Sequence, residues 1–238
     1  MISFLRLTVA LALTIATTAA PSAIEPFVPH APENLNNAVA TASLSTAAAS
    51  LGYLQCHSLA TGRIFGYVRN AYNSYGEYIG VNPSTIPSDV AARLLVRVDL
   101  AAGGEGPVNV GVQNAPSRTY PFFGAVAGEN GPNLGNNHSY VFVVGTGDES
   151  TPGSAPSLLS NSFTQATGKR RKAASAVWKF NATSGEVKPT WINEDGNAVD
   201  VTVGYLNGAF AMTGNTTAFE KYYDDEDVTW LKFVFSTN

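Results

Sequence analysis

Short apolar runs and polar breaks alternate along the chain from residue 51 onward. Clusters of Gly, Pro, Asn and Ser separate runs that are either apolar throughout or alternate with polar residues. Side chains on a strand point to opposite faces in turn, so these runs are predicted strands. They are LGYLQCH (51–57), RIFGYVR (63–69), RLLVRVDL (93–100), PVNVGVQ (107–113), YPFFGAVA (120–127), SYVFVVG (139–145), SAVWKF (175–180), PTWIN (189–193), AVDVTVGYL (198–206), GAFAMTG (208–214) and VTWLKFVF (228–235).

This spacing is typical of an antiparallel sandwich or barrel. We therefore expect an all-β fold, an antiparallel β-sandwich or jelly-roll-like domain with short helices at most. The segment PSDVAARLL (87–95) is the one short helical candidate. Turn sequences at 181–185 (NATSG) and 194–197 (EDGN) predict a three-strand meander over residues 173–206.

The first 50 residues have a different composition. Arg6 is the only charged residue among the first 24, an apolar run follows it, and small residues follow the run. This order predicts a secretory signal peptide over residues 1–23, cleaved between Ala19 and Ala23, and too short for a membrane span. Residues 24–50 are rich in Ala, Ser, Pro and Asn and are predicted to be a low-complexity arm or propeptide. Residues 51–238 then form a single domain, and the protein is expected to be secreted or extracellular.

Charge and cysteine content narrow the classes of partner. Without Arg6, 13 basic residues stand against 18 acidic ones, a net of −5. This acidic balance argues against nucleic acid as a partner.

The single cysteine, Cys56, cannot form an intrachain disulfide, and the residue type predicts a buried thiol.

Two segments resemble a known group of proteins. The sequences AVWKFNATSGEVKPTWINEDGN and GRIFGYVRNAYNSYGEY, with the later segment 217–219, are similar to uncharacterised secreted β-sandwich proteins of mushroom-forming fungi. The resemblance implies a secreted β-sandwich domain. It transfers no functional residues.

Three sequons for N-glycosylation fit a secreted protein. They begin at Asn137, Asn181 and Asn215, and each lies in a polar stretch that predicts a surface turn.

The strongest candidate for a binding site is YVRNAYNSYGEYIG (67–80). Aromatic rings stack on sugar faces, and amides or carboxylates bind hydroxyls, so this cluster favours glycan binding. The candidate residues are Tyr72, Asn73, Tyr75, Glu77 and Tyr78. The alternative is a tyrosine-rich loop that packs over the end of the sheets with its hydroxyls in water. Tyr222 and Tyr223 form a weaker candidate of the same kind.

Signals for catalysis are sparse. Only His57 and His138 lie in the predicted domain, and no Gly-x-Ser-x-Gly or metal-ligand spacing is present, so we expect no catalytic triad, no metal and no cofactor. The acidic run 224–227 lacks the spaced ligands of a calcium loop. Three functions stay open. They are a non-catalytic extracellular or cell-wall-associated protein that binds glycan, a wall-polysaccharide hydrolase with paired carboxylates, and a structural or interaction module.

The basic run Lys-Arg-Arg-Lys (169–172) interrupts an otherwise weakly charged chain. A nucleic-acid site is excluded by the acidic context, and a dibasic cleavage site would separate the C-terminal strands from the sheet. We interpret the run as the solvated end of a long loop, with a core strand beginning near Ala173. Oligomeric state has no signal in the sequence.

Overall fold

The computed structural model describes residues 49–82, 87–99, 106–224 and 227–237. These residues belong to one compact unit. The predicted signal peptide, and the predicted arm up to residue 48, lie outside them, as do residues 225 and 226 of the acidic run. The first strand that the structure describes begins at Ser50, one residue before the predicted domain boundary.

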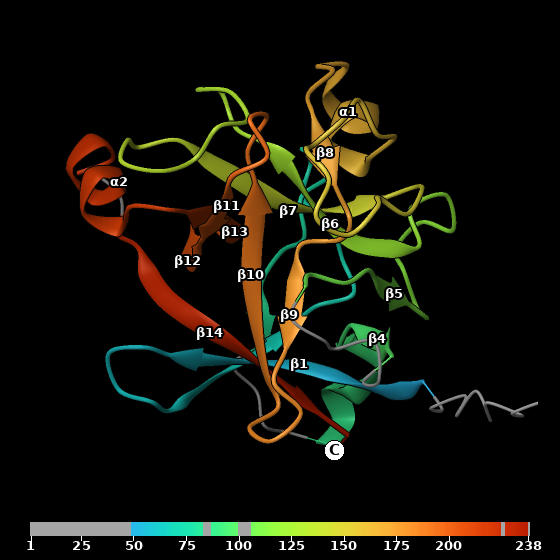
Figure 1. Cartoon of the computed structure of the whole chain (residues 1–238). Coiled ribbons are helices and arrows are strands. Elements are labelled where there is room, and N and C mark those ends of the chain that lie inside the picture. Colours follow the sequence, from blue (N-terminus) through green and yellow to red (C-terminus); the bar gives the residue numbers. More distant parts are fainter. Residues whose placement is uncertain (1–48, 83–86, 100–105, 225–226, 238) are drawn as a thin grey trace, which may run out of the picture. The chain divides into compact units, whose positions relative to one another are not determined.

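Eight antiparallel strands pair in a closed ring (Figure 1). The ring closes because the first strand pairs with the last described strand, from Tyr53 opposite Ser236 to Ser58 opposite Leu231. In order around the ring, the strands are β1 (Ser50–Ser58), β14 (Thr229–Ser236), β12 (Thr202–Leu206), β13 (Ala209–Thr213), β7 (Tyr140–Thr146), β6 (Phe122–Ala127), β5 (Val110–Val112) and β4 (Leu95–Val98).

Among the described residues, six further strands branch from this ring. One pair extends from β1, a three-strand meander extends from β14, and one short strand pairs with β6. They are β2 (Ile64–Val68), β3 (Val81–Asn82), β9 (Trp178–Phe180), β10 (Glu186–Ile192), β11 (Ala198–Asp200) and β8 (Ala173–Ala174). The predicted meander is thus present as β9, β10 and β11, with its turns at the expected positions.

Helices are few and short in the described residues. They are the 3-10 helix η1 (Pro87–Ala92), α1 (Ser162–Thr167) and α2 (Thr216–Tyr222). The first coincides with the helical candidate at 87–95, whereas α1 and α2 occur where the sequence predicted loops. The expected all-β class with short helices is confirmed.

The main core fills the interior of the ring. Trp178 is fully buried there, its ring stacks on Phe123 of β6 with centroids 4.8 Å apart, and its indole N–H donates to the Phe123 carbonyl at 2.5 Å. Cys56 is also fully buried, and burial raises the pKa of its thiol well above the usual range. The prediction of a buried Cys56 thiol is confirmed.

Candidate functional site

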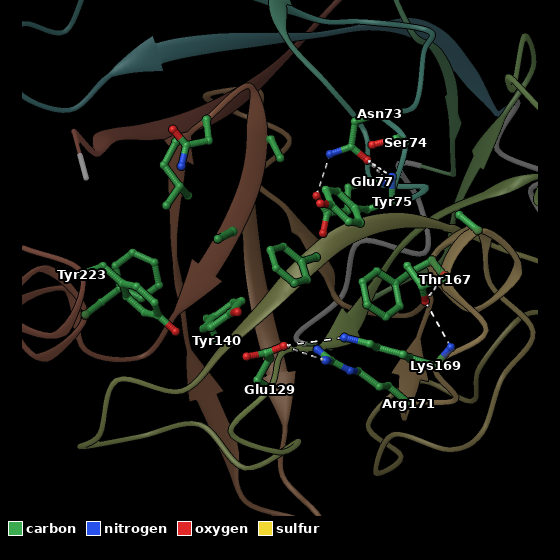
Figure 2. A pocket seen from close by; sticks show the side chains of 18 residues that line it. Asn73, Ser74, Tyr75, Glu77, Glu129, Tyr140, Thr167, Lys169, Arg171 and Tyr223 are labelled. Carbon is green, nitrogen blue, oxygen red and sulfur yellow. Dashed lines mark hydrogen bonds and ion pairs between the residues drawn. The ribbon is translucent and has the colours of Figure 1, made fainter. Parts of the chain in front are cut away.

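A groove of about 740 Å³ lies on the outer face of β7 and β13, between α1 and α2 (Figure 2). Its lining residues come from five parts of the chain. They are residues 73–75 and Glu77; Glu129; Tyr140 and Phe142; Phe163, Ala166, Thr167, Lys169 and Arg171; and Leu206, Asn207, Ala209, Ala211, Phe219 and Tyr223.

The floor of the groove follows from strand alternation. Val141 and Val143 of β7 point into the main core, so Tyr140 and Phe142 point outward. On the neighbouring strand, Ala211 pairs with Phe142 and places only a methyl group beside it. Large rings next to small side chains leave a hollow.

The two short helices form opposite walls. On α1, Phe163 stacks against Phe142, with ring centroids 6.0 Å apart. On α2, Phe219 contacts Tyr140 edge-on, with centroids 5.7 Å apart. Phe142 packs against the separate apolar clusters beneath both helices, so it lies where the walls meet the floor.

An asparagine caps each helix at its N-terminus. The Oδ1 atom of Asn161 accepts a hydrogen bond from the backbone N–H of Thr164 at 2.8 Å, and Asn215 accepts one from Ala218 at 2.9 Å. N-caps of this kind stabilise a helix by about 1 kcal/mol. They help to explain how helices of six and seven residues form here.

Residues 77–80 enter the sheet between β7 and β13. These strands pair over residues 211–213 and then diverge, and the Tyr78 N–H donates to Val143 while the Gly80 N–H donates to Gly208, each at 3.0 Å. Side chains in this segment alternate as in a strand. Glu77 therefore points into the groove, and Tyr78 points into the main core.

Asn73 organises the turn that precedes Glu77. Its Oδ1 atom accepts the backbone N–H groups of Tyr75 at 2.9 Å and Glu77 at 3.0 Å. Its Nδ2 atom donates to the Glu77 carboxylate at 2.7 Å. Gly76 has a φ of +76° and lies against the backbone of Ser162, where an added Cβ would be 2.2 Å from the carbonyl oxygen. Glycine is required there on both grounds.

Ser162 holds this turn against the sheet. Its hydroxyl donates to the Gly76 carbonyl at 2.5 Å and accepts the Gly145 N–H of β7 at 3.0 Å. One side chain at the start of α1 therefore connects the turn, the helix and the strand.

Glu77 is a buried acid without an ion-pair partner in the described structure. Only 5% of its surface is exposed. Burial raises its pKa, and the hydrogen bond from Asn73 and the positive charge of Arg171 oppose that shift. Its proton therefore dissociates at a higher pH than that of an exposed glutamate.

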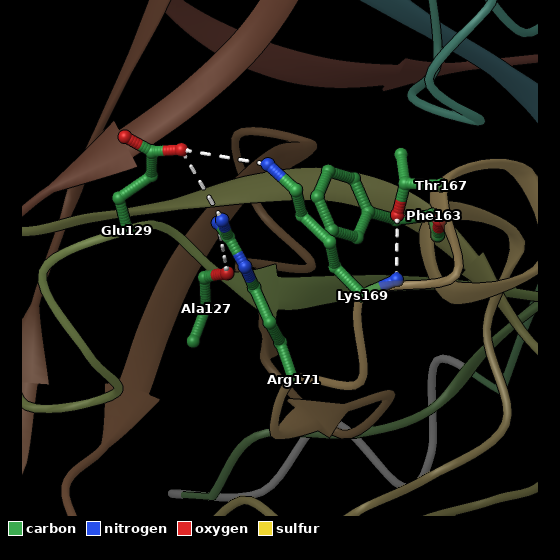
Figure 3. Close-up of polar contacts among 6 residues, drawn as sticks. All are labelled: Ala127, Glu129, Phe163, Thr167, Lys169 and Arg171. Atoms are coloured by element: carbon green, nitrogen blue, oxygen red, sulfur yellow. Dashed lines mark hydrogen bonds and ion pairs between the residues drawn. The ribbon is translucent and has the colours of Figure 1, made fainter.

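A second carboxylate, Glu129, belongs to an ionic cluster on another part of the rim (Figure 3). Its Oε1 atom lies 3.4 Å from Arg171 Nη2 and 4.0 Å from Lys169 Nζ. Figure 2 shows this cluster and the group of Asn73, Tyr75 and Glu77 at separate places around the groove.

Three of the predicted glycan-binding residues line the groove. They are Asn73, Tyr75 and Glu77, and Tyr75 is 59% exposed.

The other two, Tyr72 and Tyr78, pack in the core instead of forming an exposed tyrosine patch. Tyr78 is fully buried, and its ring lies 4.7 Å from that of Tyr72. Tyr72 lies over Gly145, where a Cβ would be 2.0 Å from the Tyr72 hydroxyl oxygen. The chain reverses in a tight turn at 73–76, and this sends both rings inward.

The weaker tyrosine pair is also divided. Tyr223 lines the groove, whereas Tyr222 stacks flat on His138 with ring centroids 3.7 Å apart.

The three sequons differ in exposure: Asn137 and Asn181 are exposed, but Asn215 is half-buried as the cap of α2. The expectation of a surface turn at Asn215 is therefore wrong, because the segment begins a helix.

Sequence reasoning missed the basic side of the groove. Within the run 169–172, Lys169 and Arg171 line the groove, while Lys172 forms an ion pair with Glu194. The run does end a loop, and a strand does begin at Ala173. That strand, β8, has only two residues, however, and the expected single core strand through Phe180 is divided, because β8 pairs with β6 whereas Trp178–Phe180 form β9 and pair with β10. The spacing of Lys169 and Arg171, two residues apart, is the one sequence signal that places them on one side.

Within the described residues, no three His, Cys, Asp or Glu side chains gather to hold a metal ion. No helix in that part of the chain is both long and apolar enough to cross a bilayer.

Comparison of the chain with protein-family models, curated proteins and solved structures finds no match. The resemblance to secreted fungal proteins stays a prediction.

Proposed function

We propose that this is a secreted, non-catalytic extracellular or cell-wall-associated protein whose groove binds a glycan. The observation that carries the proposal is the exposed Tyr75 side chain beside the half-buried Asn73 and the buried Glu77, over an aromatic floor. A sugar residue has an apolar face that packs on an aromatic ring and hydroxyls that hydrogen-bond to amide and carboxyl groups. A single sugar residue can therefore contact both Tyr75 and the pair of Asn73 and Glu77.

The dimensions of the groove support this proposal. Small-molecule sites commonly have volumes of roughly 300–1,000 Å³ and combine apolar walls with a few polar groups. At about 740 Å³, the groove is large enough for a short oligosaccharide. Asn73 holds the turn with three hydrogen bonds, which favours a site formed before the ligand arrives.

A glycan array probed with the purified domain tests the proposal, with Tyr75→Ala as the site variant. Phe65→Ala is the matched control, because Phe65 is an exposed aromatic residue that does not line the groove. We expect Tyr75→Ala to weaken binding by about tenfold, a typical value for an aromatic contact of 1–2 kcal/mol. Absence of binding to every glycan, or equal loss in both variants, would overturn the proposal.

A hydrolase is the second candidate, and the two carboxyl groups that line the groove favour it. A general acid needs a raised pKa, and burial gives Glu77 that shift. Glu129, paired with cations, would serve as the ionised partner. Release of reducing sugar from a wall polysaccharide, abolished by Glu77→Gln, would establish this activity.

Secretion is supported by the leader-like residues 1–23, and the exposed sequons Asn137 and Asn181 fit glycosylation along that route. Recovery of the protein from the medium, with a new N-terminus between Ala19 and Ala23, would test this. A retained leader would contradict it.

We also propose that the strand ring is flattened into two facing layers, as in a sandwich. Support comes from Phe123 on β6 and Phe233 on β14, strands on different sides of the ring, whose rings lie 6.1 Å apart. Facing sheets in a sandwich pack about 10 Å apart. An experimental structure with a wider, open interior would contradict this.

A further inference from the structure

The charged side chains around the groove are unevenly paired. Lys169 and Arg171 both meet the same oxygen of Glu129, and Glu77 lies elsewhere with Asn73 as its hydrogen-bond partner. Two cations therefore share a single carboxylate.

Arg171 is held in place independently of Glu129. Its side chain is only 16% exposed, lies 5.0 Å above the Phe163 ring, and donates to the Ala127 carbonyl at 3.3 Å (Figure 3). These contacts persist if the Glu129 side chain moves away. The guanidinium then keeps its charge and its remaining N–H donors at the groove.

Glu129, in contrast, is weakly held. Its side chain is 68% exposed, and its distances to the two cations are 3.4 and 4.0 Å. Water screens the charge of this exposed carboxylate, so its ion pairs change an equilibrium by no more than about fivefold. An incoming carboxylate can take the place of this side chain at small cost, and an arginine fork binds carboxylates with two parallel hydrogen bonds.

We propose that the groove selects an acidic saccharide, whose carboxylate replaces the Glu129 side chain on Arg171 and Lys169. This inference rests on the proposed glycan-binding function and names the class of sugar, a uronic acid. Glu129 acts as an internal counter-ion that occupies the acid subsite in the free protein. The Tyr75 side of the groove contacts the neutral part of the ligand.

Calorimetric titration with two oligosaccharides of equal length tests this, using hexamers of galacturonic acid and of β-1,4-linked glucose. Glu129→Gln should tighten binding of the acidic hexamer by up to about fivefold, since it removes the competing charge. Lys169→Met should weaken that binding, and added salt should weaken it further. Lys188→Met is the matched control, because Lys188 is half-exposed and pairs with Asp200 outside the groove.

The outcomes separate this inference from the function on which it rests. Preference for the acidic hexamer, with opposite effects of Glu129→Gln and Lys169→Met, supports it. If neutral glycans bind at least as tightly and neither charge variant differs from the control, the acid subsite is wrong and glycan binding stands. If neither hexamer nor any arrayed glycan binds, both are wrong.

Discussion

Replacing Ser162 with alanine removes one hydroxyl that joins three elements around the groove. The Gly76 carbonyl and the Gly145 N–H both lose their bond to this side chain, and both groups are buried. Each such bond contributes a net 0.5–1.5 kcal/mol, and a buried group left without a partner costs more. We therefore expect the variant to lose about 2–3 kcal/mol of unfolding free energy.

Urea unfolding followed by tryptophan fluorescence measures this loss, because Trp178 and Trp191 are fully buried. The same loss lowers the thermal midpoint by roughly 4–12 °C for a domain of this size. Ser160→Ala is the matched control two residues away, and its exposed side chain should change stability by less than about 0.5 kcal/mol.

Ser162→Ala should also weaken glycan binding, because the turn that carries Tyr75 and Glu77 loses its attachment to the sheet. An unfolding free energy indistinguishable from that of Ser160→Ala would refute the reasoning. It would mean that the two buried groups find other partners.

Three further variants test other parts of the structure. Gly145→Ala should cost about 1–3 kcal/mol in urea unfolding, since the new methyl group would overlap the Tyr72 hydroxyl; wild-type stability would contradict a close contact between Tyr72 and Gly145. Burial raises the pKa of Glu77 in the folded protein. The protonated carboxyl group therefore contributes to the stability of the fold below the ordinary glutamate pKa of 4.5, and this contribution is lost as pH rises through the folded pKa. The stability of the wild type relative to Glu77→Gln should therefore fall from pH 4 to pH 7, and parallel pH profiles would contradict this. Asn181→Gln should remove one glycan from protein secreted by a eukaryotic host, seen as a mass decrease, because Asn181 is exposed at a turn; an unchanged mass would show that the sequon is unused.

The strands were predictable because a strand with one face in the core alternates apolar and polar residues, and this alternation is visible in the sequence. The run at 198–206 is one exception, since it divides into β11 and β12. The first part pairs with β10, and the second pairs with β13 and β14. The sequence contains no signal for this division, because the two parts form one continuous alternating run although they pair with different strands.

The helices and the groove were not predictable from periodicity. Six or seven residues span fewer than two helical turns, which is too short for a 3.6-residue pattern to show. One signal was available: residues 140–144 of β7 are apolar on both faces, so some other element must cover the outer face. The capping residues Asn161 and Asn215 mark where those covering helices begin.

The candidate site was predicted in part, and the reason lies in the backbone. Tyrosines three residues apart suggested one exposed patch, but the tight turn at 73–76 and the strand-like segment after it decide the direction of each side chain. Tyr75 therefore projects from the tip while Tyr72 and Tyr78 enter the core. Glu129 and Arg171 lie 42 residues apart in sequence, and only the pairing of distant strands brings them together.

Closure of the strand ring has a consequence for the order of events during synthesis. Strand β14 pairs with β1, β10 and β12, so its eight residues provide a partner for three strands made earlier. Until the ribosome has released residues 229–236, each of those strands lacks the partner that β14 supplies. Unpaired strand edges bind other chains readily, so the nascent protein is prone to aggregate until β14 has left the ribosome.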